Sequence, residues 1–542
     1  MADNRKSRED VESRIGERNI QRWGLDMHNP VFFTSSGFII VLLTLTLMYK
    51  EQAASAFSAT QTFVSDQFGW FLILTVNILL IYSIFLAFGR FRKVRIGGQD
   101  AKPEFSTRSW FAMLFSAGMG IGVIYWSVAE PITHFSTTPF LAQSGTVDAA
   151  QVGMVTTFLH WGLHAWAVYA VVGLALAFFA YNWGLPLTVR SLFYPLLGER
   201  IYGWIGDVVD TIAVLSTMFG ITTVLGLGAG QISAGAAYIF GTPDNITVEV
   251  GIIAFITAIA TMSVVAGLDG GVKRLSDLNI GVAVVLLVFI LIVGPTVFIF
   301  NGFIQNVGYY LQNLVFLGTW GETYEGGTWQ NTWTVFYWAW WVSWAPFVGI
   351  FIARISKGRT VKEFMLGVIL VPSIVCFFWF SAFGGTALHQ ALNGVGDIVG
   401  AVDENFATAF FVMVSELPMS GIISFIAVVL IFTFFVTSSD SGSLVIDSIT
   451  AGGKDDAPVM QRVFWAITEG VVAAVLLVGG GLTALQTAVL VLGLPFSVVI
   501  LFVCYSLYLG LKAEFLDEVL PRENEAAEKE RLEGQGEAVP AD

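Results

Sequence analysis

The densest run of aromatic side chains in this sequence is WAWWVSWAPF at residues 338–347. Trp338, Trp341 and Trp344 recur every three residues, and Trp340 lies four residues before Trp344. One side of a helix here would be covered by indole rings near the bilayer centre, too deep for the interfacial belt that tryptophan usually occupies. Desolvated aromatic faces bind cations, quaternary ammonium groups above all. The segment therefore predicts a site for a methylated onium group.

A second aromatic group, HWGLHAWAVY, lies at residues 160–169. Trp161 and Tyr169 are eight residues apart, within about 80° of each other on one helix. They could form the opposite wall of an aromatic cage around the onium group, facing the tryptophans of residues 338–347. His160 and His164 at i, i+4 could face a common metal ion, but we expect no carboxylate or thiolate partner for them, and no HExxH motif is present. Packing histidines bonded to neighbouring groups are the favoured interpretation.

The segment SAGMGIG at residues 116–122 places three glycines at alternate positions in the middle of an apolar run. Each glycine costs about 1 kcal/mol relative to alanine in a helix interior, so the helix is expected to unwind here. Unwound carbonyls can bind a desolvated cation, and the N-terminus of the next half-helix favours an anionic group. Close packing of two helices is the alternative, and the glycines alone do not distinguish an unwound segment from a packing contact.

Neither aromatic segment contains a carboxylate. A buried organic cation would need a counter-ion, whereas a zwitterion carries its own and a co-bound metal cation can offset its carboxylate. These residues favour a methylated-ammonium zwitterion with a coupling ion. The hydroxyl-rich run FFVTSSDSGS at residues 434–443 could complete the ion site. Hydroxyls bonded back to their own helix are the alternative.

Such a site needs helices that hold it within a membrane. Of the 542 residues 55% are hydrophobic and 13% charged, and the mean hydropathy is +0.72, which excludes a cytosolic enzyme and a nucleic-acid-binding protein. The two cysteines lie in apolar runs, so no disulfide framework is expected. Twelve apolar runs can cross a bilayer. They are 31–49, 69–90, 109–129, 153–180, 207–235, 246–266, 277–300, 331–353, 364–386, 419–447, 462–480 and 484–510.

The basic residues give an independent test of this count. Of the 27 lysines and arginines only Lys50 falls outside the segments that would lie on the cytoplasmic side. Twelve spans with both termini inside are therefore predicted. Apolar residues at helical spacing over 303–317 predict an amphipathic helix in the outer interface. The acidic tail at 511–542 is expected to be a solvated, partly helical or disordered end.

Together these motifs resemble the betaine/choline/carnitine transporter family over about residues 15–515. The resemblance depends on the GMGIG break at 118–122, on residues 160–169, on the block 338–359 and on the TSSDSGS run at 437–443. It implies an all-α integral membrane protein with a LeuT-like 5+5 inverted repeat and two extra N-terminal helices, assembled as a homotrimer.

With the resemblance, the chain divides into six parts. These are a cytoplasmic segment (1–30), peripheral helices (31–108), a first repeat (109–300), an interfacial helix and loop (301–330), a second repeat (331–510) and an acidic cytoplasmic tail (511–542).

The resemblance also implies a set of site residues. The aromatic box would be Trp161, Trp166, Tyr169 and Trp341, with Trp340 and Trp344 on the inward route. The backbone break would involve Gly118, Met119, Gly120 and Gly122. The principal sodium site would use Ser116, Met119, Phe434, Thr437 and Ser438. A second sodium site would use Thr217 and Phe347, although Ile221 stands where a second hydroxyl would be needed.

Within the family, Gly122 replaces the aspartate of proton-coupled choline carriers, and residues 208–232 lack the basic side chain of sodium-independent exchangers. We therefore expect a symporter in a prokaryotic inner membrane that couples sodium influx to the uptake of glycine betaine or a related methylated-onium compatible solute, with no cofactor beyond that ion. Alternatives within the class are a carrier of ectoine, carnitine, choline or a sulfonium analogue, or a proton-coupled or sodium-independent member. A membrane enzyme and a channel are the rivals outside it.

Overall fold

The computed structural model describes residues 15–118, 120–266, 269–454 and 456–535, and most of them are helical. A short antiparallel hairpin precedes the first long helix; it consists of β1 (Asn19–Arg22) and β2 (Leu25–His28). The long helices are α2 (Asn29–Met48), α3 (Lys50–Phe88), α4 (Thr107–Gly118), α5 (Ile121–Ser136), α6 (Val147–Trp161), α7 (Leu163–Trp183), α9 (Trp204–Phe240), α10 (Ile246–Val265), α11 (Asp269–Val293), α12 (Thr296–Gln312), α15 (Thr334–Arg354), α16 (Val361–Leu392), α19 (Ser420–Thr450), α20 (Val459–Glu514) and α21 (Leu520–Gln535). The short ones are α8 (Tyr194–Leu197), α13 (Leu314–Thr319), α14 (Trp329–Thr332), α17 (Ile398–Glu404) and α18 (Ala409–Ser415).

Ten of the described helices are long and apolar enough to cross a membrane, or eleven if the bent pair α4 and α5 is counted as one span. The chain is thus an all-helical, multi-pass membrane protein. The difference from the twelve predicted spans lies in α20, which contains both of the last two. A straight helix of 56 residues would be about 84 Å long, far more than a bilayer needs. The backbone of α20 leaves the helical conformation at Gly480, the last residue of the first of these predicted spans, and at Gly481 directly after it.

Other boundaries also differ from the prediction. Helix α3 begins at Lys50, well before residue 69. The predicted span started later because the first turns of α3 are polar, and the search was for apolar runs. The predicted span 277–300 ends early, since Pro295 lacks the N–H that would continue α11, and α12 begins at Thr296. The predicted interfacial helix at 303–317 falls in α12 and α13. The tail is helical as far as Gln535.

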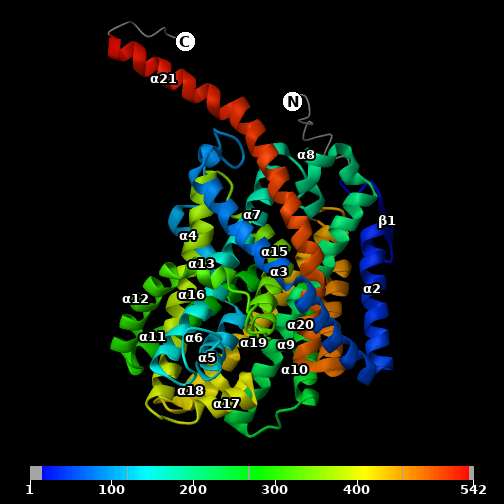
Figure 1. The fold of residues 1–542 in the computed structure, drawn as a ribbon. Helices are drawn as coiled ribbons and strands as arrows, with labels where there is room; N and C mark the ends of the chain where they lie inside the picture. Colours follow the sequence, from blue (N-terminus) through cyan, green and yellow to red (C-terminus); the bar gives the residue numbers. More distant parts are fainter. Residues whose placement is uncertain (1–14, 119, 267–268, 455, 536–542) are drawn as a thin grey trace.

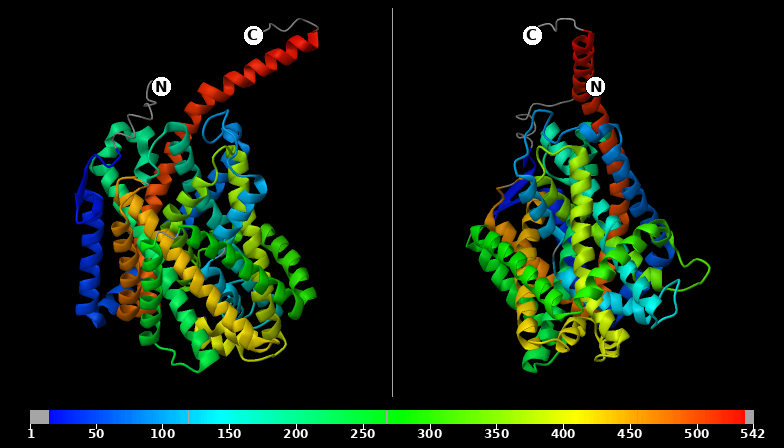
Figure 2. Two further views of the ribbon diagram at one scale, coloured as in Figure 1. Left: turned by 180° about the vertical axis from the view of Figure 1, so that it is seen from behind. Right: turned by 90° about the vertical axis from the view of Figure 1, so that its left-hand side faces the viewer.

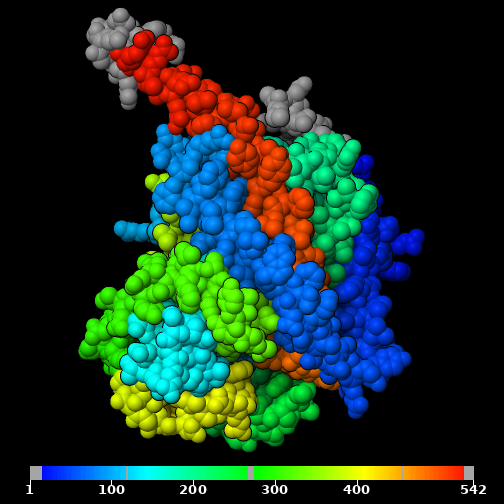
Figure 3. Space-filling model, in the orientation of Figure 1, coloured from blue at the N-terminus to red at the C-terminus, as the bar shows by residue number. Residues whose placement is uncertain are grey.

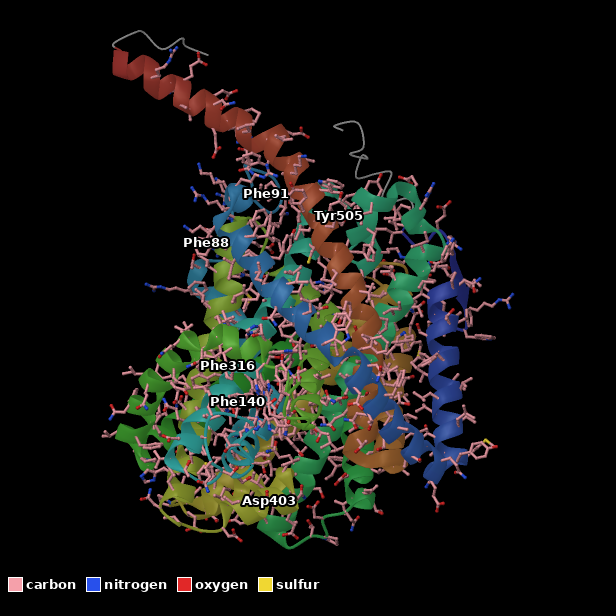
Figure 4. All side chains as sticks on the ribbon, in the orientation of Figure 1. Phe88, Phe91, Phe140, Phe316, Asp403 and Tyr505 are labelled. Carbon is pink, nitrogen blue, oxygen red and sulfur yellow. The ribbon has the colours of Figure 1, made fainter. Side chains whose placement is uncertain are left out.

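The arrangement of the elements separates two ends of the molecule. In Figure 1, α8 and α21 lie at the upper end and α17 and α18 at the lower end, and the two views of Figure 2 agree. Phe88 and Phe91, beside the basic turn Arg90–Lys93, lie toward the upper end, whereas Asp403 lies at the lower end (Figure 4). The upper end therefore carries basic residues, as expected for a cytoplasmic side.

The innermost helices are those that the motifs occupy. Helices α7, α9 and α15 are almost wholly buried, whereas α2, α10 and α11 expose most of their surface. Helix α3 packs along α20, and both are visible side by side on the face drawn in Figure 3. The exposed apolar helices are the ones available to lipid.

An ion pair and hydrogen bonds connect the N-terminal hairpin to the upper ends of α19 and α20. Lys454 Nζ lies 2.5 Å from Asp26 Oδ2, and the Asp26 amide donates to Gln461 Oε1 at 2.9 Å. Burial alone would raise the pKa of Asp26, but hydrogen bonds from Lys454 and Asn19 and the lysine charge outweigh it, so that this pKa is lowered.

Candidate functional site

A cavity of about 330 Å³ lies at the centre of the helices. It is enclosed by the break between α4 and α5, by α6 and α7, by α15 and by α19, with contributions from α9 and α11. The structure places all six sequence-predicted aromatic residues in its wall. They are Trp161, Trp166, Tyr169, Trp340, Trp341 and Trp344.

The aromatic rings form a cage around one part of this cavity. Trp340 and Trp341 stack with centroids 5.0 Å apart and an interplanar angle of 11°. Trp161 meets Trp341 edge-on at 4.9 Å, and Tyr169 meets it edge-on at 6.1 Å. Trp166 extends the wall by an edge contact to Tyr169 at 5.3 Å. Rings from three helices, α6, α7 and α15, thus face a shared space, as cation–π binding of an onium group requires.

Hydrogen bonds outside the cavity hold two of these rings in place. Trp341 Nε1 donates to the His160 carbonyl, and Trp161 Nε1 donates to Glu130 Oε2, each at 2.8 Å. In contrast, Trp340 Nε1 and the Tyr169 hydroxyl are buried without a hydrogen-bond partner among the described residues. Other atoms of both residues line the cavity, but these two polar atoms are themselves buried away from it.

The predicted break in the third span is present. Helix α4 ends at Gly118, α5 begins at Ile121, and the two are bent by 62°; Met119 lies outside the described residues. Gly120 is extended and precedes the first turn of α5, and that turn lines the cavity. The first N–H groups of a helix have no partner within it, so the cavity meets the positive end of α5.

Gly122 is the point where this break touches the cage. A Cβ atom at Gly122 would lie 3.1 Å from Cη2 of both Trp161 and Trp340. A Cβ atom at Gly120 would meet no heavy atom within 4 Å. A side chain at residue 122 would therefore be in tight contact with both indole rings, whereas residue 120 has room for one.

The hydroxyl-rich run faces the break across the same cavity. Ser116, Phe434, Thr437 and Ser438, all predicted for the principal sodium site, line it. The Thr437 hydroxyl donates to the carbonyls of Thr433 at 3.2 Å and Phe434 at 3.1 Å. Hydroxyl and carbonyl oxygens are suitable ligands for a hard cation such as sodium.

The two residues predicted for a second sodium site are not brought together in this wall. Phe347 lines the cavity, whereas Thr217 does not. Thr217 is buried in α9, and its hydroxyl has no hydrogen-bond partner among the described residues.

The charged residues of the cavity wall agree with the observation that neither aromatic segment contains a carboxylate. Its wall, as far as the structure describes it, contains no carboxylate, and Arg354 is the basic residue in it. Arg354 is exposed at the end of α15, next to a segment in which Thr360 pairs with Arg95. The cavity thus extends from the cage to the basic end of the molecule.

A second cavity, of about 320 Å³, lies toward the opposite end. Tyr125 lines it, whereas Gly122, one turn earlier in α5, lines the first cavity. Its wall includes the carboxylate-bearing residues Glu249, Asp403 and Glu404.

Sequence reasoning missed Glu130 and its partners. The prediction that His160 has no carboxylate partner is wrong, because Glu130 Oε1 lies 2.6 Å from His160 Nδ1. Glu130 was assigned to an outer loop, since the apolar run ends at residue 129, whereas α5 continues to Ser136. A glutamate that directly follows an apolar run was the available signal. His164 instead packs in parallel on Trp338, with centroids 5.6 Å apart, in line with the favoured interpretation.

Comparison with known proteins adds independent findings. The model of the betaine/carnitine/choline family of transporters matches residues 30–516. The chain is 48% identical over 507 residues to a glycine betaine/proline/choline/ectoine transporter of Vibrio parahaemolyticus, covering 92% of this chain and 90% of that one. It is 46% identical to glycine betaine transporter 1 of the same organism, covering 92% and 97% of the two chains. A glycine betaine transporter of Acinetobacter baylyi is 42% identical, with 90% and 74% covered.

Proposed function

The chain belongs to the betaine/carnitine/choline family of transporters, and we propose from this membership that it couples sodium influx to the uptake of glycine betaine or a close methylated zwitterion. It is a membrane transporter of betaine-type compatible solutes and not an enzyme. The coupling ion and the preferred solute are the proposed part.

The aromatic cage is the observation that carries the proposal. The rings of Trp161, Trp341 and their neighbours would surround the onium head, at about 2 kcal/mol or more per desolvated contact. The carboxylate of the same ligand would lie toward the first turn of α5, which lines the cavity. A zwitterion suits a wall that has separate places for its two charges.

Sodium would lie between the broken helix and α19. Ser116, Phe434, Thr437 and Ser438 provide oxygen atoms on that side of the cavity, where a cation would offset the ligand's carboxylate. The second sodium site has less support, because Thr217 does not reach this wall.

The finer architecture is also part of the proposal. We take α20 as two crossings separated at Gly480 and Gly481, which with the bent pair gives twelve spans. In a LeuT-like arrangement α4–α5 and α15 would be the equivalent first helices of two inverted repeats. The basic end would face the cytoplasm of a bacterial cell, and exposed apolar residues of α12 such as Ile304 would face lipid or a second copy in a trimer.

The two cavities support alternating access. The larger one, with the cage, extends to the basic end, as expected of a carrier facing inward. The other would be the entry on the outer side, with its carboxylates attracting cations. Rocking of α5 and α15 against α9 and α19 would open one space while closing the other.

Transport by the purified protein tests the proposal. Proteoliposomes with an inward sodium gradient should accumulate labelled glycine betaine, and replacement of sodium by potassium should reduce uptake to the level of empty liposomes. Equal uptake in potassium would overturn the coupling. A proton gradient without sodium tests the proton-coupled alternative, and competition by proline, choline, ectoine and carnitine ranks the solutes.

A further inference from the structure

A buried carboxylate lies one layer behind the cage, and the transport proposal does not use it. Glu130 of α5 is fully buried, and hydrogen-bonding groups from three other residues surround it within 2.8 Å. Oε2 lies 2.8 Å from Trp161 Nε1 and 2.5 Å from the Tyr337 hydroxyl. Oε1 lies 2.6 Å from His160 Nδ1, and His134 Nε2 is 3.4 Å from the same oxygen.

The hydrogen-bond partners indicate which form of Glu130 the site suits. An indole N–H can only donate, so Oε2 accepts from Trp161. Thr334 Oγ1 lies 3.0 Å from His160 Nε2, so a hydroxyl proton donated there leaves the imidazole proton on Nδ1, facing Glu130. With the Thr334 hydroxyl donating, both carboxylate oxygens accept hydrogen bonds. With that hydroxyl accepting instead, His160 Nδ1 would accept a proton from Glu130, and we adopt the first arrangement. This arrangement suits an ionised carboxylate.

The partners of Glu130 are also parts of the cage or of its support. Trp161 lines the cavity, and Tyr337 contacts the rings of Trp161, Trp340 and Trp341 with centroids 5.7 to 6.1 Å apart. The main chain of His160 accepts the hydrogen bond of Trp341 Nε1. Movement of Glu130 would therefore change the positions of Trp161 on one wall of the cage and of Trp341 on the other.

We propose that Glu130 is a specificity-determining residue of the onium site. Its carboxylate fixes Trp161 and Tyr337 and supplies, from behind the indole, the negative charge that the described cavity wall lacks. A positively charged head in the cage would be favoured over an uncharged head of the same shape. This inference rests on the proposed function, because it assumes that the cage binds an onium group.

A metal ion held by Glu130, His134 and His160 is the competing interpretation, since one ligand atom of each lies within 4.8 Å of the others. The separation of 2.6 Å between Glu130 Oε1 and His160 Nδ1 is that of a hydrogen bond. Two atoms bound to the same tetrahedral zinc ion would be about 3.3 Å apart. The geometry favours the hydrogen-bonded network.

A pair of isosteric ligands tests the charge separately from the packing. Glycine betaine and 3,3-dimethylbutanoate differ only in a quaternary nitrogen that is replaced by carbon. Their affinities are measured by calorimetry or competition on the purified full-length protein in sodium buffer. Glu130→Gln should reduce the preference for betaine over the carbon analogue about tenfold, mainly through weaker betaine binding. A preference equal to that of the unmodified protein, with both affinities lowered together, would overturn the proposal.

Control variants separate charge from position. Glu130→Asp keeps the charge but shifts it, and Tyr337→Phe removes one donor, so both should weaken the two ligands alike and preserve the preference. If Glu130→Gln does not fold, the double variant Glu130→Met, Tyr337→Phe replaces the Glu130–Tyr337 pair by apolar groups, leaves Trp161 Nε1 and His160 Nδ1 without this partner, and should show the same loss of preference. Elemental analysis that finds one transition metal per chain, lost in Glu130→Gln, would also overturn the proposal. Failure of the unmodified protein to bind any onium solute would instead refute the proposed function.

Discussion

Helices α5 and α15 line the same cavity but contribute to it in opposite ways. Helix α5 begins at the break and exposes the first turn of its main chain, with glycine at residues 120 and 122. Helix α15 runs unbroken from Thr334 to Arg354, through Pro346, and contributes bulky indole rings. The broken helix offers backbone dipoles, and the intact one offers side chains.

This difference matches the two ends of a zwitterion. Backbone N–H groups at a helix N-terminus favour an anion, and aromatic faces favour a desolvated cation. Gly122 joins the two regions, because the absence of a side chain lets Trp161 and Trp340 approach the backbone of α5. We therefore expect changes in α15 to affect the onium head first, and changes in α5 to act through the position of the cage.

The largest effect is expected from Trp341→Ala. Trp341 stacks on Trp340 and contacts Trp161, so its removal opens the cage and should weaken betaine binding by about 2 kcal/mol, or roughly 30-fold. Titration calorimetry measures this. Trp338→Phe is the matched control, since Trp338 is equally buried in α15 but does not line the cavity. Equal losses in the two variants would show that α15 acts only as a packing element.

Gly122→Ala should have the next largest effect. The new methyl group would press on both indoles at 3.1 Å, and overpacking of this kind typically costs about 1–3 kcal/mol. We expect betaine affinity to fall about tenfold. Gly120→Ala is the control on the same helix, because its methyl group would meet nothing within 4 Å and its extended backbone suits any residue. If both variants bind betaine normally, the broken helix does not position the cage.

The two regions also differ in how well the sequence predicted them. The tryptophans of α15 were found because side-chain type and helical spacing are local properties. The break before α5 was found because alternate glycines disfavour a helix. The position of Glu130 after an apolar run was a local signal for a buried carboxylate, but its partners in α6 and α15 come from distant parts of the chain, and no local pattern reveals those contacts.

Some fold elements were missed for similar reasons. The break at Gly162 between α6 and α7 comes from a single glycine, and a Cβ atom there would lie 2.6 Å from the Phe377 ring. The polar first turns of α3 escaped a search for apolar runs, although they are helical. Hydropathy thus locates apolar runs, but it does not locate the full lengths or the breaks of the helices.

Thr437→Ala should produce a smaller effect, on the ion rather than on the cage. Loss of one oxygen near the broken helix should raise the sodium concentration for half-maximal uptake about fivefold, in line with about 1 kcal/mol per lost polar contact. Ser441→Ala is the control, since Ser441 lines the same cavity on α19 but lies outside the predicted ion site. Sodium-titrated uptake in proteoliposomes distinguishes them. The same sodium dependence in both variants would place the ion elsewhere.

The smallest effect is expected from Trp344→Ala. Its ring is only half-buried, packs on Phe347 at 4.9 Å, and lies beyond the stacked pair toward the basic end. A contact at the rim of a site contributes little, so betaine affinity should fall about twofold at most. The rate of release into the liposome lumen should change more than affinity, if Trp344 lies on the inward route. A loss as large as that of Trp341→Ala would mean that the onium group binds nearer to Arg354, and that the whole indole face of α15, rather than its central pair, forms the cage.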